Sequence, residues 1–273
     1  MSVRLRPLPG QDPTPRPGPL RGDGLAATDP AIAGVVARMD TALSRLEQLG
    51  DPARHFLTTY RDVTHAVGAA AGSGRVEDPA WLARWDVAFA EPYLEALAAR
   101  ERGDHVAGPW REAFAAPADL HPYLHVLLGM NAHINLDMPL SLLAVLSDAD
   151  VRDERLMASR HRDHEALDSV IAALVPEQSR RLVRVAGPGA APGPLDRALM
   201  PASRAASRQV LRHGRHAVWR NTGVLLGARR EGPGALRAAT DRLERLTTDR
   251  VADLVGPRHP LLHLARRGFG VRL

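Results

Sequence analysis

The sequence predicts an all-α fold, and three observations lead to that prediction. Ala, Leu and Arg dominate the chain while aromatic residues make up only 4% of it, a composition that favours helices over strands. Apolar residues recur at three- and four-residue spacing over long stretches. No alternating run has a recognisable partner run elsewhere, as a sheet would require. We therefore expect a single bundle-like domain of several helices over residues 29–273.

Residues 1–28 have a different composition from the rest of the chain. They are rich in Pro, Gly and Arg and show no apolar periodicity. Such a segment buries too little apolar surface to offset the entropy of ordering, so we predict a disordered N-terminal tail. The stretch GPGAAPGP at 187–194 is typical of a linker-like loop, but too little sequence follows it to define a second domain.

The first three helices are predicted to begin at Asp-Pro pairs, because Asp caps a helix and Pro suits its first position. The pairs are Asp29-Pro30, Asp51-Pro52 and Asp78-Pro79, and the helices extend to about residues 49, 71 and 100. A short helical piece at 109–115 and a helix from about residue 122 follow. Later helices are expected at 154–175, 176–185, 202–229 and 235–255, before an ordered closing segment at 259–273.

The helix from residue 122 leads into the apolar stretch 129–146, GMNAHINLDMPLSLLAVL, which carries a polar side chain at every second position. These side chains are Asn131, His133, Asn135 and Asp137. The alternation fits a strand as well as a helix, and we choose a helix because the flanks are rich in Leu and Ala. Pro139 is expected to break or kink that helix and to push Met138 out of helical geometry. Polar groups inside an apolar segment are costly unless satisfied, so they predict a site or a network.

Two helical pairs with four-residue spacing are candidates for a metal site. An imidazole and a carboxylate four positions apart project from one helix face and can hold one cation. His133 with Asp137 is the first such pair, His164 with Asp168 is the second, and His55 is a further candidate ligand. With no cysteine in the chain, the expected metal is Zn²⁺, Fe or Mn²⁺ held by nitrogen and oxygen.

The same residues leave two functions open. In the first, a metal at His133 and Asp137 activates a bound water, with Asn131 and Asn135 in the same buried polar pocket, and the protein is a metal-dependent hydrolase acting on a small-molecule substrate. In the second, His133 and Asp137 share a buried hydrogen bond and Asn131 and Asn135 pair on another face. The Asn/His/Asp group is then a structural network in a metal-free helical protein that binds a small molecule or a partner.

Composition also limits the partners and the compartment. The net charge is +5 and the pI about 10.7, but Arg carries all of this charge without any lysine. Most of the arginines lie near Asp or Glu, as in DRLERLTTDR, a pattern typical of a salt-bridged helical surface, so we rank a nucleic-acid partner last. No run of eighteen apolar residues and no signal-like N-terminal segment is present, so we expect no membrane partner and a cytoplasmic protein.

Four stretches together resemble a bacterial family of uncharacterised helical proteins, the domain of unknown function 5995 family. They are His55-Phe56 with Tyr60 and Thr64, DPAWLARWDVAFAEPYLEAL at 78–97, GMNAHINLDMPLSL at 129–142, and the closing RGFGVRL. The resemblance covers residues 55–273, and the Asn-Ala-His-Ile-Asn-x-Asp block is its most specific part. It implies a shared helical fold and a shared site, with no reaction attached.

A weaker resemblance is to the all-α superfamily of zinc-dependent phospholipases C and single-strand nucleases. Proteins of that superfamily use a helical His-x-x-x-Asp closely followed by proline, as in His133, Asp137 and Pro139, and further pairs of the kind formed by His164 and Asp168. This chain departs from the pattern because it lacks the N-terminal Trp ligand and any His soon after the proline. The resemblance therefore implies one or two metal ions rather than a trinuclear zinc site.

Overall fold

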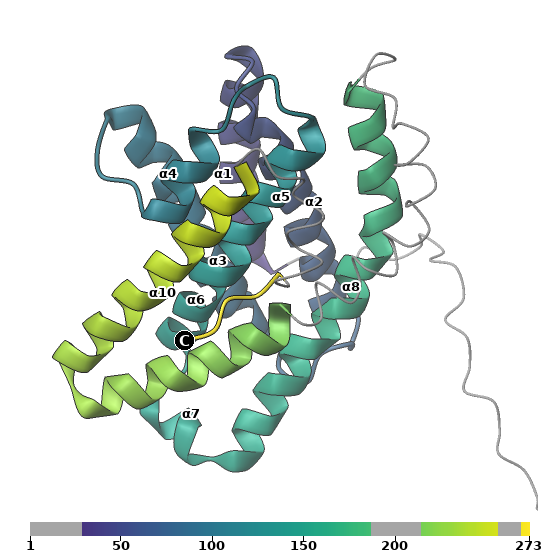
Figure 1. The fold of residues 1–273 in the computed structure, drawn as a ribbon. Helices are drawn as coiled ribbons and strands as arrows, with labels where there is room; N and C mark the ends of the chain where they lie inside the picture. Colours follow the sequence, from purple (N-terminus) through teal and green to yellow (C-terminus); the bar gives the residue numbers. More distant parts are fainter. Residues whose placement is uncertain (1–28, 187–213, 256–268) are drawn as a thin grey trace, which may run out of the picture.

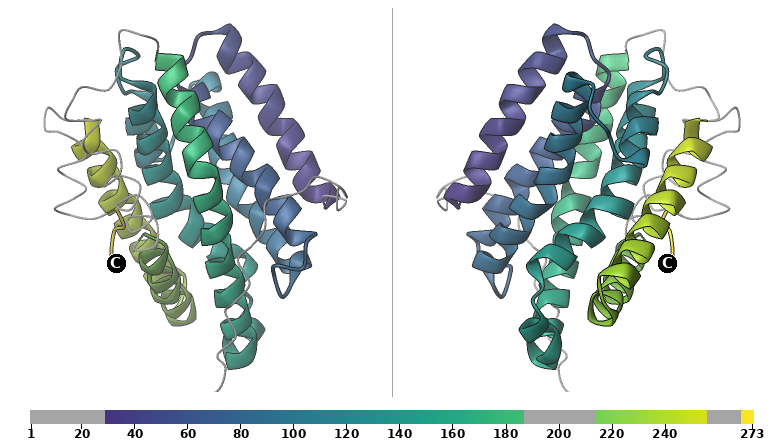
Figure 2. Two further views of the ribbon diagram at one scale, coloured as in Figure 1. Left: turned by 90° about the vertical axis from the view of Figure 1, so that its right-hand side faces the viewer. Right: turned by 90° about the vertical axis from the view of Figure 1, so that its left-hand side faces the viewer.

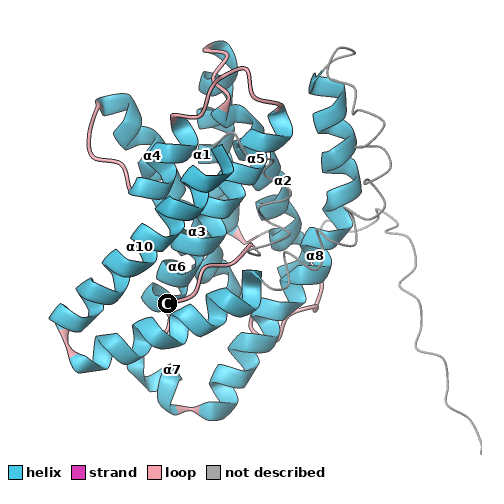
Figure 3. Ribbon diagram, viewed as in Figure 1, coloured by secondary structure: helices cyan, strands magenta, loops and turns pink. Residues whose placement is uncertain are grey.

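The computed structural model describes residues 29–186, 214–255 and 269–273, and this part of the chain is helical, with no strand (Figure 1; Figure 3). The helices are α1 (Pro30–Gln48), α2 (Ala53–Ala71), α3 (Pro79–Arg102), α4 (Gly108–Phe114), α5 (Pro122–Ala132), the π-helix η1 (His133–Asp137), α6 (Met138–Val145), α7 (Asp148–Arg152), α8 (Glu154–Ala186), a helix at 214–231, and α10 (Pro233–Val255). The all-α prediction is thus confirmed. The predicted tail at 1–28, the loop at 187–194 and residues 202–213 and 259–268 lie outside the described residues.

The predicted Asp caps are present at the start of α1 and α3, whereas in α2 the N-cap is Pro52 and Asp51 lies one residue before it. Asp29, Asp51 and Asp78 each accept a hydrogen bond from a backbone N–H of the first turn at 2.8 or 2.9 Å. These bonds satisfy N–H groups that have no partner inside the helix, which is why the chain begins a helix at these points.

Helices from distant parts of the sequence pack around a central rod formed by α5, η1 and α6. α1 packs on α2 and α3, whereas α10 packs on α4, α5 and η1. Figure 2 shows α1 and α10 at opposite edges of the molecule, with the other helices between them. Large buried side chains fill the centre, including Trp81, Trp85, Tyr93 and Trp110. None of the described helices is long and apolar enough to cross a lipid bilayer.

The central rod continues through Pro139, so of the expected break or kink no break occurs, and the expected displacement of Met138 from helical geometry is wrong. Met138 has φ −65° and ψ −47°, ordinary helical values, and its backbone N–H bonds to the carbonyl of His133, five residues earlier. This five-residue spacing defines a π-turn, which widens the helix by one residue. Proline has no backbone N–H to donate, and its ring would collide with the preceding turn of an α-helix. The wider π-turn leaves room for the Pro139 ring and tolerates the missing hydrogen bond.

A second proline is also accommodated inside a helix. The pieces expected at 154–175 and 176–185 form the single helix α8, with Pro176 in its interior. Buried side chains lie on both sides of the proline, Leu167 and Val170 before it and Leu182 after it. This packing offsets the roughly 3 kcal/mol that an interior proline costs a helix.

Candidate functional site

The four alternating polar residues all lie in the interior of the protein. Asn131, His133, Asn135 and Asp137 have exposed fractions between 0% and 3%. All five residues of η1 are buried, because neighbouring helices cover this part of the rod on every side. The polar side chains must therefore find their partners within the protein.

His133 and Asp137 are bonded to each other. His133 Nδ1 lies 2.8 Å from Asp137 Oδ2, and the indole N–H of Trp110 in α4 donates to the same oxygen at 2.9 Å. The structure thus contains the buried His–Asp hydrogen bond that the sequence left as an alternative to a metal site. An ionised Asp137 only accepts hydrogen bonds, so with the carboxylate in that form the imidazole proton lies on Nδ1 and a lone pair on Nε2.

Aromatic rings enclose the imidazole of His133. Phe89 stacks on it with ring centroids 3.7 Å apart and planes at 11°, and Tyr60 meets it at 62° with a centroid distance of 4.2 Å. Further rings lie at 5.7–6.4 Å, from Phe56, Tyr93 and Trp110. Nε2 is buried and has no hydrogen-bond partner among the described residues. A buried nitrogen of this kind is unusual and marks His133 as a candidate functional residue.

Burial shifts the pKa values of His133 and Asp137 in opposite directions. It lowers the pKa of His133, although Asp137 raises it in part, so the imidazole is neutral at pH 7. It raises the pKa of Asp137, against the opposing effect of His133 and Trp110. Both shifts favour the uncharged forms, as expected where water has been removed from around the groups.

Asn131 and Asn135 form a separate network on the other side of the rod. Asn135 Nδ2 donates to Asn131 Oδ1 at 3.1 Å, and it also reaches the backbone oxygen of Phe269 at 3.1 Å. Asn135 Oδ1 accepts from the backbone N–H of Val271 at 3.0 Å. These asparagines therefore bind the closing segment and do not face His133.

The other predicted metal ligands do not join this centre. His164 is 1% exposed and lies against Trp85 and Trp219, with ring centroids 5.5 and 5.4 Å away, while Asp168 forms an ion pair with Arg215 at 2.5 Å. His55 lies at the start of α2, 6.0 Å from the ring of another histidine, and burial lowers its pKa to about 4. Across the described residues, no group of three or more His, Cys, Asp or Glu side chains is arranged to hold a metal.

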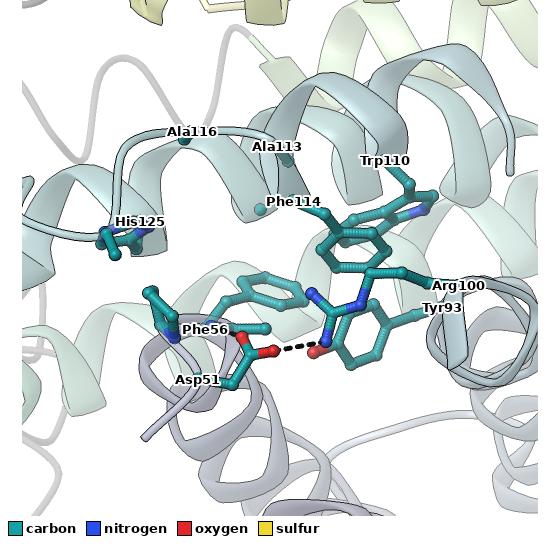
Figure 4. A pocket seen from close by; sticks show the side chains of 13 residues that line it. Asp51, Phe56, Tyr93, Arg100, Trp110, Ala113, Phe114, Ala116 and His125 are labelled. Atoms are coloured by element: carbon teal, nitrogen blue, oxygen red, sulfur yellow. Dashed lines mark hydrogen bonds and ion pairs between the residues drawn. The ribbon is translucent and has the colours of Figure 1, made fainter. Parts of the chain in front are cut away.

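A pocket of about 140 Å³ lies between the start of α2 and helices α3, α4 and α5 (Figure 4). Aromatic side chains form much of its wall, from Phe56, Tyr93, Trp110 and Phe114. Arg100 at its edge donates to Asp51 at 2.6 Å, and its guanidinium carbon lies 4.4 Å from the centre of the Phe114 ring. Trp110 connects the pocket to the buried pair, since its ring lines the pocket and its N–H reaches Asp137.

Several of these residues were not identified from the sequence. Trp110 and Arg100 contact their partners only after helices distant in sequence come together, and no local spacing predicts that. His125 also lines the pocket, and burial lowers its pKa. The sequence contains one indication of His125: it is the lone histidine in the apolar run YLHVLLG, where burying a polar side chain is costly unless it has a partner or a function.

Comparison with known proteins gives a family without an assigned activity. No curated protein and no solved structure matches this chain. The model of a family of unknown function, DUF5995, matches residues 32–257, which include almost all of α1, the central rod and the whole of α10. The match thus spans the buried His/Asp pair and the pocket, and the chain belongs to the DUF5995 family of unknown function.

Proposed function

We propose that this protein is a metal-free helical protein that binds a small carboxylic acid in the pocket between α2, α3, α4 and α5. The observation that carries the proposal is the guanidinium of Arg100 at the edge of an aromatic-lined pocket. Arg100 uses Nη2 for Asp51, and Nε and Nη1 have no acceptor among the described residues. A carboxylate in the pocket can accept hydrogen bonds from the N–H groups that remain free on this guanidinium.

The size and walls of the pocket narrow the ligand further. Apolar cavities of roughly 150 Å³ in proteins admit a benzene-sized molecule, and this pocket has about 140 Å³. Its aromatic walls favour an apolar or aromatic body through burial and ring contacts. Asp51 already neutralises part of the Arg100 charge, so a monocarboxylate suits the pocket better than a dicarboxylate. A single-ring monocarboxylic acid meets each of these conditions.

Calorimetric titration with benzoate tests the proposal. Benzoate should bind the full chain with one site, whereas its methyl ester and benzylammonium should bind at least tenfold more weakly. Arg100→Met, which keeps an apolar stem beside Phe114, should weaken benzoate binding at least tenfold. The matched control is Arg102→Met, because Arg102 lies in the same helix turn but pairs only with exposed acids. Absent benzoate binding, or equal loss in the two variants, would remove the proposal.

In this proposal the Asn/His/Asp group is structural. The support comes from its hydrogen bonds, because Asp137 is bonded to His133 and Trp110 while Asn135 is bonded to Asn131 and the closing segment. Elemental analysis of purified protein, beside a His133→Ala variant, tests this role. We expect no stoichiometric metal in either protein. Zinc, iron or manganese that is present in the wild type and lost in the variant would contradict it.

A second function, a metal-dependent hydrolase, is favoured by one specific observation. His133 directs Nδ1 to a carboxylate and keeps Nε2 free, which is how metal-binding histidines are commonly oriented. In that function Nε2 is the ligand and Asp137 orients the ring. Metal in the wild type, lost on His133→Ala and kept in a His164→Ala variant, would support this function over the first.

A further inference from the structure

Two asparagines hold residues 269–273 by their backbone alone. Asn135 donates to the oxygen of Phe269 at 3.1 Å and accepts from the N–H of Val271 at 3.0 Å. Asn221, in the helix at 214–231, donates to the oxygen of Val271 at 3.1 Å and accepts from the N–H of Leu273 at 3.1 Å. Each carboxamide thus spans two alternate residues of the segment with one donor and one acceptor.

These four backbone groups lie along one edge of an extended chain. In such a chain the N–H and C=O of alternate residues point to the same side, so residues 269, 271 and 273 present a continuous edge. The two carboxamides bind this edge as a neighbouring strand would, although no strand is present in the described part of the chain. Recognition of backbone edges is the means by which proteins bind extended peptides without requiring a particular sequence.

Apolar contacts supply the sequence preference that backbone bonds lack. Phe269 and Val271 are 1% and 4% exposed, whereas Arg272 between the bound positions is exposed. Phe269 enters the main core close to Gly214, where an added Cβ would come within 3.0 Å of its ring. Val271 and the partly buried Leu273 pack in a second apolar cluster with Leu136, Leu225 and Leu243. The pattern bound is therefore Phe-x-Val-x-Leu.

We propose that Asn135 and Asn221, with the apolar sockets beside them, form a binding site for an extended peptide of the pattern Phe-x-Val-x-Leu, and that residues 269–273 of the chain itself are its occupant. α10 ends at Val255, so thirteen residues separate it from the bound segment. That length of chain spans up to about 43 Å when extended, enough for the segment to leave and rebind. The site is then open to the same segment supplied in trans as a free peptide.

A cleavable version of the full chain tests this inference. A protease site is placed between residues 256 and 268, the protein is cut after folding, and the C-terminal fragment is removed by extensive dialysis. A labelled Gly-Phe-Gly-Val-Arg-Leu peptide is then titrated while anisotropy is measured. The cut protein should bind one equivalent of peptide. The uncut protein should bind it at least tenfold more weakly, since the tethered segment competes at an effective concentration of order millimolar.

Matched peptides and one host variant define the specificity. A peptide with Ala in place of both Phe and Val should bind at least tenfold more weakly, whereas one with Ala in place of Arg should bind equally, because Arg272 is exposed. Asn221→Ala should weaken the wild-type peptide at least tenfold while the helical circular dichroism is kept. The inference is overturned if the cut, folded protein takes up no peptide, or if Asn221→Ala binds it equally. Loss of fold on cutting would also overturn it, because the segment would then be an inseparable part of the core.

Discussion

Asp86 provides the most direct test of how burial controls charge in this protein. It lies on α3 among aromatic residues, is 6% exposed, and its Oδ2 has no hydrogen-bond partner among the described residues. Burial raises the pKa of Asp86 from 3.8 to about 7. Burial also raises the pKa of nearby Tyr60, and the Asp86 carboxylate adds to that rise.

The raised pKa makes the stability of the fold dependent on pH in a defined direction. Well below pH 3.8 the carboxyl is protonated in both folded and unfolded chains and contributes nothing to the pH dependence of the unfolding free energy. As the pH rises toward 7, the unfolded chain releases its proton while the folded chain retains it, so the folded state loses stability. A shift from 3.8 to about 7 corresponds to a loss of about 4 kcal/mol, and above pH 7 the loss stays constant.

The variant Asp86→Asn removes this dependence, because an amide does not ionise. Urea unfolding followed by tryptophan fluorescence should give similar unfolding free energies for variant and wild type at pH 4. At pH 8 the variant should be more stable, by up to about 4 kcal/mol. Asp119→Asn, at an exposed position, is the control and should change stability little at either pH. The reasoning fails if the difference between Asp86→Asn and wild type is the same at both pH values.

Two further substitutions test the packing around the pocket. Gly129→Ala places a Cβ into the ring of Phe56 and should destabilise the fold by about 1–3 kcal/mol in urea unfolding, whereas Gly34→Ala, on an open face of α1, should leave it equal or up to about 1 kcal/mol more stable. Trp110→Phe replaces the indole with a smaller phenyl ring and removes the N–H that donates to Asp137, so it should destabilise the fold by about 1–3 kcal/mol; an unchanged unfolding free energy would show that neither the bond nor the larger ring contributes.

The fold class and most helix positions were predictable because they depend on local sequence. An Asp-Pro pair acts on the first turn of its own helix, and the starts at Asp29, Asp51 and Asp78 agree with prediction to within one or two residues. The π-turn was not predictable from propensity. Its cost is offset by the packing of the whole rod among its neighbours. Pro139 therefore lies inside the rod, although sequence rules predict that a helix ends before a proline.

The site was predictable only where its members are close in sequence. The spacing of His133 and Asp137 correctly indicated that the two side chains meet, and the hydrogen bond between them is local. Trp110, the third member, lies 27 positions away from Asp137 and depends on how α4 packs. The same limit applies to His164 and Asp168. They have the four-residue spacing of a helical pair, but Arg215 from a helix distant in sequence forms an ion pair with the carboxylate of Asp168. Local spacing indicates neighbours within a helix and says nothing of competing partners from other helices.

The alternation of polar residues in the central rod is explained by the fact that other parts of the protein pack on opposite sides of the rod. Residues two apart on a helix lie about 200° apart, so alternate positions point to nearly opposite sides. His133 and Asp137 accordingly share the aromatic side, whereas Asn135 lies on the side of the closing segment. Double-mutant cycles should therefore give a coupling of at least about 1 kcal/mol between His133→Gln and Asp137→Asn, which share a bond. His133→Gln and Asn135→Ala should be additive within about 0.5 kcal/mol, and strong coupling between them would show that the two sides form one network.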